Sequence, residues 1–283
     1  MYRVSEDYRS YFEEYTMIYF KAKDSGDAMK LMAAHPDFLL MCGSTDMAAG
    51  LKKEKKGTGI IDIATLDELR YIERASDTMH IGALSTISDI LKARKIQKHL
   101  PLLTAAVEVF ASHQIRNLAT LGGNIANASP AADLVAPLLA YNATVTLGSQ
   151  EGERIIRLED LFCGYKCTKL KHEIILSIHI PLTKHGWYYR KTGTRERLNI
   201  TKVSLAMVRN SEGYAISGAS LNPYASRFRE VENLLNTTHF NDEKIEEALA
   251  QDITPSGSMR STKTYRMRVA FNMIKEALSK LEA

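Results

Sequence analysis

The chain changes its pattern of apolar residues once, near residue 183, and this change most constrains the fold. Before it, short apolar runs with strand composition alternate with segments whose apolar residues recur at helical spacing. After it, strand-like runs come first and helical segments follow. Strands followed by helices are typical of an α+β architecture. Pro181 and the charged stretch 183–186 therefore predict a domain boundary.

The two parts of the chain are expected to contain short elements. The predicted strands are 17–20, 38–42, 59–63, 79–83, 144–147, 173–180, 187–191, 203–209 and 214–221. The predicted helices are 25–34, 47–53, 67–69, 85–91, 101–112, 130–141, 227–236, 241–251 and 260–281. Pro130 follows Ser129, a pair that favours a helix beginning at the proline. A polar loop rich in glycine is expected between the helices at 101–112 and 130–141.

Composition excludes several classes of protein. A chain of 283 residues is long enough for roughly two domains with real cores. The hydrophobic share of 45% and the charged share of 25% are those of a globular protein, so dominant disorder is excluded. Lys plus Arg minus Asp plus Glu is 37 − 33 = +4. This small and scattered excess gives no nucleic-acid-binding surface.

The cysteines indicate where the chain works. Cys42, Cys163 and Cys167 are odd in number and form no CxxC pair, so we expect neither a disulfide framework nor a zinc ribbon. This usage predicts a reducing, cytoplasmic location. An iron–sulfur cluster needs four thiolates, so any cluster is expected in another chain. Met1 to Tyr15 lacks the apolar stretch of a secretory signal, and no run approaches the ~18 apolar residues of a membrane span.

Two segments have the composition of an anion-binding cradle. Gly43-Ser44-Thr45 and Thr120-Leu121-Gly122-Gly123-Asn124 are rich in glycine, hydroxyl and amide groups and have no charged side chain. Backbone N–H groups in such segments can hold a diphosphate, because glycine lets the backbone approach closely. Neither segment fits GxGxxG or GxxxxGK[ST]. Each segment alone is equally compatible with a tight turn.

A longer match connects the two segments to one cofactor. Residues 110–133, FASHQIRNLATLGGNIANASPAAD, strongly resemble the flavin signature of molybdenum-hydroxylase flavoprotein subunits. The segment 40–47, LMCGSTDM, resembles the other FAD loop of the same family, which includes xanthine dehydrogenases and carbon monoxide dehydrogenase. The resemblance covers about residues 17–283. It implies a two-subdomain FAD-binding domain of the PCMH (vanillyl-alcohol-oxidase-like) type at 17–182, a smaller α+β domain at 183–283, and an N-terminal extension at 1–16.

The resemblance also implies a role for individual residues. The segments 40–47 and 120–124 would hold the FAD diphosphate, and Phe110 would lie against the adenine. Asp133 would be a polar contact of the cofactor. Ile175 and Lys191 fall where the family places residues near the isoalloxazine ring; a solvated lysine is an equally good interpretation of Lys191. The implied cofactor contacts are Leu40, Met41, Cys42, Gly43, Ser44, Thr45, Asp46, Met47, Phe110, Thr120, Leu121, Gly122, Gly123, Asn124, Asp133, Ile175 and Lys191.

The chain departs from the family pattern at three places, of which the first is the N-terminal extension beyond the family's usual start. Gly43-Ser44 stands where the family usually has Gly-Gly, and serine disfavours a positive φ, which bears on FAD affinity. Asn199-Ile200-Thr201 stands where Asp-Ile-Ala is common, so a carboxylate is absent.

The resemblance predicts an electron-transfer subunit. FAD would accept electrons from [2Fe–2S] clusters of a small partner subunit, which receives them from a molybdopterin-binding large subunit, and would pass them to NAD⁺ or another acceptor. No catalytic side chain and no metal ligand is expected in this chain. Two alternatives remain at this stage: a stand-alone flavin oxidoreductase, and a structural subunit with a degenerate flavin site.

Overall fold

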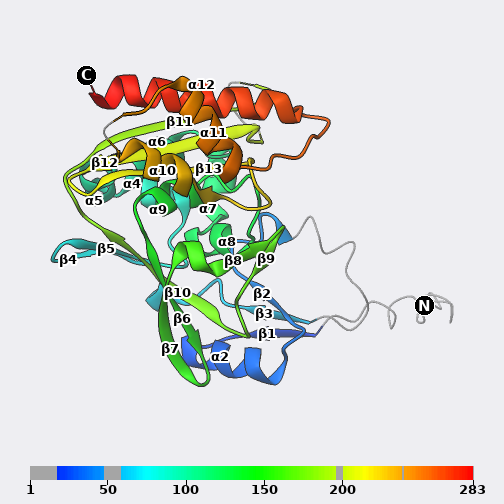
Figure 1. Ribbon diagram of the computed structural model, residues 1–283. Coiled ribbons are helices and arrows are strands. Elements are labelled where there is room, and N and C mark those ends of the chain that lie inside the picture. The colour runs from blue at the N-terminus through cyan, green and yellow to red at the C-terminus, as the bar shows by residue number, and fades with distance from the viewer. Residues whose placement is uncertain (1–17, 48–58, 196–199, 238, 283) are drawn as a thin grey trace, which may run out of the picture.

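A small parallel sheet begins the described part of the chain. The computed structural model describes residues 18–47, 59–195, 200–237 and 239–282 (Figure 1). Strands β1 (Tyr19–Lys21), β3 (Ile60–Asp62) and β2 (Leu39–Met41) lie in this order and run parallel. Helix α2 (Ser25–Ala34) connects β1 to β2, and the Asp24 side chain caps it by accepting from Asp27 N. The helix expected at 47–53 lies almost wholly outside the described residues.

A five-stranded antiparallel sheet follows. Its order is β4 (Ile72–Ala75), β5 (Thr78–Gly82), β10 (Ile174–Pro181), β6 (Thr144–Ser149) and β7 (Gly152–Arg157). Alternate side chains of β5 and β6 point from one face of the sheet into the core. Met79, Ile81, Val145 and Leu147 on this face are fully buried. The predicted strands in β5, β6 and β10 are confirmed. β4 and β7 were not predicted, because these edge strands are mostly exposed and carry no apolar alternation.

Short helices cover the buried face of this sheet. They are α4 (Ile87–Lys92), α5 (Arg94–His99), α6 (Pro101–Glu108), α7 (His113–Leu118), α8 (Leu121–Ala126) and α9 (Val135–Ala140). The 3-10 helix η2 (Asp67–Leu69) instead packs through Leu69 in a separate cluster with the parallel sheet. The expected loop before Ser129 was wrong, since it contains α7 and α8. The helix expected at 130–141 begins only at Val135, because Ser129 Oγ accepts from Ala131 N in a turn and caps no helix.

The last hundred residues form a second sheet covered by helices. Strands β11 (Gly186–Thr192), β12 (Val203–Asn210), β13 (Gly213–Ala219) and β14 (Ser226–Arg227) pair antiparallel in this order. Helices α10 (Arg229–Leu235), α11 (Asp242–Asp252) and α12 (Lys263–Glu282) pack on one face, with α12 lying along β11 and β12 (Figure 1). The α+β prediction, with strands before helices, is confirmed.

The second sheet shares a core with the first part of the chain. Its other face packs on α6 and α9. Ala206, Val208, Ala215 and Ala219 belong to the same buried cluster as the helices and the five-stranded sheet. Small side chains let the sheet and α9 approach closely. The two parts of the chain are therefore joined by packed apolar surface, and side chains of β11 can reach the first part.

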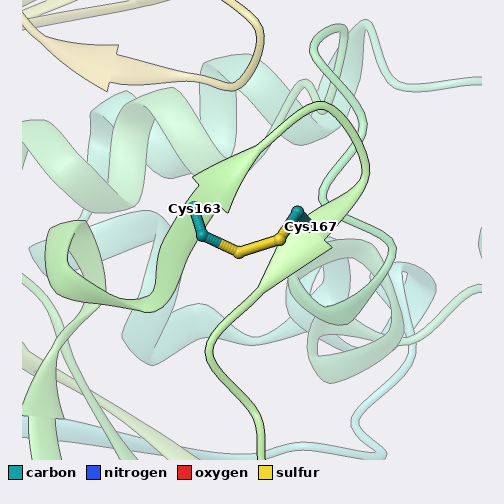
Figure 2. The surroundings of a disulfide bond; sticks show 2 residues. All are labelled: Cys163 and Cys167. Atoms are coloured by element: carbon teal, nitrogen blue, oxygen red, sulfur yellow. A yellow bond between two sulfur atoms is a disulfide. The ribbon is translucent and has the colours of Figure 1, made fainter.

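A disulfide corrects the interpretation of the cysteines. The 3-10 helix η3 (Leu158–Leu161) leads into a hairpin of β8 (Phe162–Gly164) and β9 (Cys167–Thr168), where Cys163 and Cys167 are bonded to each other (Figure 2). The prediction that these cysteines form no disulfide was wrong. A spacing of four residues, which fits no familiar motif, suits a hairpin whose two strands bring the Cα atoms to 5.3 Å.

The described residues contain neither a helix suited to cross a membrane nor a cluster of metal-binding side chains. No helix in these ranges has both the length and the apolar composition to traverse a bilayer. Within the same ranges, no three His, Cys, Asp or Glu side chains are grouped so that they could hold a metal ion.

Candidate functional site

The segment after β2 lies against the end of α7. Residues 42–47 follow the carboxyl end of the parallel strand β2 and pass beside the end of α7. Gly43 makes the closest approach: a Cβ there would lie 1.9 Å from Leu118 O and 3.2 Å from Ala119 Cα. Both atoms belong to the backbone and cannot rotate away. Position 43 therefore requires glycine for this contact, whatever its φ.

The second glycine-rich segment is a helix start and not a loop. Thr120 caps α8, and its Oγ1 accepts from Gly123 N at 3.1 Å. Gly122 packs on Ala83, the residue that follows β5, and an added Cβ at position 122 would lie 2.7 Å from Ala83 Cβ. This close packing outweighs the low helix propensity of the Gly-Gly pair. Glycine-rich sequence here therefore marks tight packing of a helix on a strand.

The two segments meet. Cys42 Sγ lies 3.3 Å from Thr120 Oγ1, across 78 residues of sequence. Gly123 faces the same thiol, since an added Cβ would lie 3.2 Å from Cys42 Sγ. The backbones of 42–44 and 118–123 thus line one side of a common space. Had they lain apart, no single ligand could have contacted both.

A cavity of about 660 Å³ opens between the two segments. This volume is within the range of small-molecule and cofactor sites. Two polar atoms in its lining, Ser44 Oγ and Asn124 Oδ1, are buried and have no hydrogen-bond partner among the described residues. Buried polar atoms are nearly always paired, so an unpaired hydroxyl and an unpaired amide oxygen in one cavity indicate a polar ligand.

Ser44 also has an unusual backbone conformation. Its φ is 53°, in the left-handed region that favours glycine. A non-glycine residue held in this region costs about 1–3 kcal/mol. The strained serine and its unpaired hydroxyl occur at the same residue, which is a pattern typical of ligand-binding segments.

A buried ion pair borders the cavity at the junction with the second sheet. Lys191 of β11 donates from Nζ to Asp133 Oδ2 at 2.7 Å and to Val109 O at 3.3 Å. The side chains of Lys191 and Asp133 are only 5% and 11% exposed. Thr201 Oγ1 donates to the other carboxylate oxygen. Burial raises the pKa of Asp133, while Lys191 and the Thr201 hydroxyl act in the opposite direction.

The cavity contains most of the residues singled out from the sequence. Those lining it are Leu40, Cys42, Gly43, Ser44, Thr45, Asp46, Met47, Phe110, Thr120, Gly122, Gly123, Asn124, Asp133 and Ile175. Three others do not line it. Met41 lies in β2, Leu121 is fully buried in the core, and Lys191 reaches the site only through Asp133.

Sequence reasoning missed other lining residues. Asn127 and Ser129 follow α8, and Glu173 begins the approach to β10. Ile200 and Thr201 come from the second part of the chain, and Ile200 is about half exposed at 51%. The departure at 199–201 was noticed, but nothing in the sequence indicated that Thr201 would bind Asp133. Thr201 and Asp133 are 68 residues apart in the sequence, and only the fold brings them within hydrogen-bonding distance.

Comparison with known families identifies the family of the chain. The family model described as the FAD binding domain in molybdopterin dehydrogenase matches residues 11–183, which is more than half of the chain. The chain belongs to this family. The model of the CO dehydrogenase flavoprotein C-terminal domain matches residues 188–281. The chain is therefore an FAD-binding flavoprotein subunit of the molybdenum-hydroxylase type, and so a subunit of an oxidoreductase.

Individual relatives agree with the family. The xanthine dehydrogenase FAD-binding subunit of Escherichia coli O157:H7 is 30% identical over 279 residues, which cover 94% of this chain and 96% of the relative. The carbon monoxide dehydrogenase medium chain of Hydrogenophaga pseudoflava is 28% identical, over 92% and 95% of the two chains. A solved structure of carbon monoxide dehydrogenase from the same organism superposes with a TM-score of 0.86 at 27% identity, covering 94% of this chain and 96% of that one.

Proposed function

We propose that this subunit holds FAD in the cavity between 42–47 and α8, accepts electrons from [2Fe–2S] clusters of a partner subunit, and delivers them to NAD⁺ or another acceptor. The observation that supports the proposal most directly is the meeting of two glycine-containing segments at one cavity whose polar atoms lack partners. FAD supplies the redox chemistry when bound, and the chain positions it.

The residues present fit a flavin dinucleotide. Main-chain N–H groups near Gly43 would hold the diphosphate without a charged side chain. The N–H groups of residues 121–124 already donate to Ser85 O, Ala83 O and the two oxygens of Thr120, so the start of α8 would border the diphosphate without donating to it through these groups. The Ser44 hydroxyl can donate to a phosphate oxygen, and Asn124 Oδ1 can accept from a sugar hydroxyl. Phe110 would contact the adenine and Ile175 the isoalloxazine ring. These assignments give each unpaired atom a partner of the right polarity.

In the proposal, the Asp133–Lys191 pair positions the protein around the cofactor, whereas a free lysine would act on the cofactor through its charge. Since the Lys191 ammonium is bound to a carboxylate, the pair carries no net charge toward the cavity. Lys191 also donates to the carbonyl of Val109, one residue before Phe110. The pair would therefore fix the position of the segment around Phe110 and join it to β11, with Thr201 holding the carboxylate in place.

The proposal extends to organisation and partners. We assign 17–182 to FAD binding and 183–283 to a second domain, and we propose a molybdopterin-binding large subunit and a [2Fe–2S] small subunit as partners. Names of relatives support this, since they include medium chains and an FAD-subunit of dehydrogenases. We further propose that the complex works in the cytoplasm.

The experiment is purification of the complex from its source, with metal analysis and a flavin spectrum. The proposal predicts FAD, molybdenum and iron together with two companion chains, and anaerobic reduction by substrate followed by NADH formation when NAD⁺ is added. A colourless isolated chain that also fails to take up added FAD would favour the structural subunit. Turnover of NADH or of a small substrate by the isolated yellow chain would favour the stand-alone oxidoreductase.

A further inference from the structure

The disulfide hairpin touches the cofactor segment, and this contact carries an inference about redox chemistry. Lys166, between the two cysteines, donates from Nζ to Asp46 Oδ2 at 3.3 Å. Asp46 belongs to the segment 42–47 that lines the cavity. The hairpin is therefore linked to the proposed FAD site across 120 residues of sequence.

The two ends of the hairpin differ in their environment. At its base, Phe162 is buried and stacks on Tyr224 of the second part of the chain, and Leu170 lines the cavity. Near its turn, Cys163 and Cys167 are both exposed, and Figure 2 shows their disulfide bridging the two strands. An anchored base with an exposed disulfide allows the tip to change without unfolding the core. Exposure also gives a thiolate access to the sulfurs.

The turn between the cysteines holds Lys166 in a strained conformation. Its φ is 48°, in the left-handed region. The disulfide closes a loop of only five residues, counted from 163 to 167, so it should stabilise the fold less than a disulfide that closes a longer loop, but it restricts this turn directly. Breaking the bond would remove this restraint on the turn, and with it the restraint on where the Lys166 ammonium group lies relative to Asp46.

We propose that Cys163–Cys167 is a reversible thiol–disulfide site that adjusts FAD binding through the Lys166–Asp46 pair; this inference rests on the proposed function. A dithiol reductant attacks the disulfide to form a mixed disulfide, and its second thiol releases the protein. Two electrons and two protons pass to the cysteines, which become two thiols, while the reductant becomes a disulfide. In a reducing cytoplasm, disulfides of this kind are transient and redox-sensing.

The test compares FAD affinity of the full chain before and after dithiothreitol, by flavin fluorescence. Alkylation of the denatured, air-purified chain should modify one cysteine, Cys42, and three after reduction. Reduction should weaken FAD binding about two- to five-fold, the range for loss of one exposed ion pair. The double variant Cys163→Ser/Cys167→Ser should bind like the reduced chain and ignore dithiothreitol, which excludes direct reduction of the flavin as the cause.

A matched pair of lysine variants locates the effect. Lys166→Ala should weaken binding in the oxidised chain and abolish the response to dithiothreitol, whereas Lys169→Ala, an exposed lysine on the same hairpin, should leave both unchanged. Equal affinities of the oxidised, reduced and double-serine chains would overturn the inference, as would three alkylated cysteines before reduction. Absence of FAD binding in every state would instead overturn the proposed function.

Discussion

Replacing Gly43 with alanine tests whether the contact between the segments 42–47 and 118–123 is required for the proposed FAD binding. The new Cβ would lie 1.9 Å from Leu118 O and 2.7 Å from Leu118 C, so segment 42–47 must move away from α7. Overpacking of this kind costs about 1–3 kcal/mol. For a chain of this size, that lowers Tm by about 2–6 °C. The displaced backbone also loses hydrogen bonds to a charged ligand worth about 1.5–3 kcal/mol each.

The loss of one such hydrogen bond corresponds to a Kd for FAD about 10- to 150-fold weaker. Thermal unfolding with and without FAD, together with fluorescence titration, measures both effects. Gly257→Ala is the matched control, because an added Cβ there meets no atom within 4 Å. If Gly43→Ala melts and binds FAD like Gly257→Ala, the close approach of the two segments does not hold the cofactor, and the reasoning from geometry is refuted.

Three other substitutions test the strain and the buried charges of the site. Ser44→Gly relieves the strain of a φ of 53° and removes an unpaired hydroxyl. The free energy of unfolding of the FAD-free chain, measured by thermal unfolding, should therefore rise by up to about 1 kcal/mol, and this rise should disappear when FAD is bound. Lys191→Met leaves the buried Asp133 without its cation and raises its pKa further. A carboxyl group whose pKa is higher in the folded than in the unfolded chain stabilises the fold at low pH, and this stabilisation is lost as the pH rises. The free energy of unfolding in urea should therefore fall as the pH rises above about 4, and it should fall more steeply in the variant than in the unsubstituted chain. Equal slopes of this free energy against pH in the two chains would contradict the pairing. Glu232→Gln removes the negative charge that pairs with Arg227, and both side chains are only 6% exposed. Arg227 would stay in place, because it also donates to Leu139 O, and would be a buried charge without a counter-ion. The free energy of unfolding in urea should fall by about 3–5 kcal/mol, and a fall below about 1 kcal/mol would show that the ion pair is dispensable.

Pattern reasoning predicted much of the fold because the central strands are apolar runs that are buried almost throughout. β10, β12 and β13 carry apolar residues with clear strand composition, and α12 repeats its apolar positions at helical spacing. The three strands are buried on both faces and α12 on one, and burial determines residue type. β7 has no such constraint, since five of its six residues are exposed.

Other features depend on contacts between distant residues. The Gly-Gly pair at 122–123 favours a loop locally, yet it forms α8 because Gly122 must lie against Ala83. The cysteines at 163 and 167 matched no motif, and their bond follows from the two-stranded hairpin of β8 and β9 that brings them together. The resemblance indicated Asp133 and Lys191 as separate cofactor contacts, whereas the fold pairs them with each other. No local pattern carries this information.

The alanine-lined contact between the second sheet and α9 has a consequence for the chain as a whole. Ser217 Oγ also donates to Ala136 O across this seam, at 2.6 Å. A protein cut at residue 182 would expose α6 and α9 to water, and an isolated fragment should aggregate instead of folding. The same contact implies a single calorimetric transition for the intact chain. We also expect that either half can be exchanged with that of a relative only if the matching small residues are transferred with it.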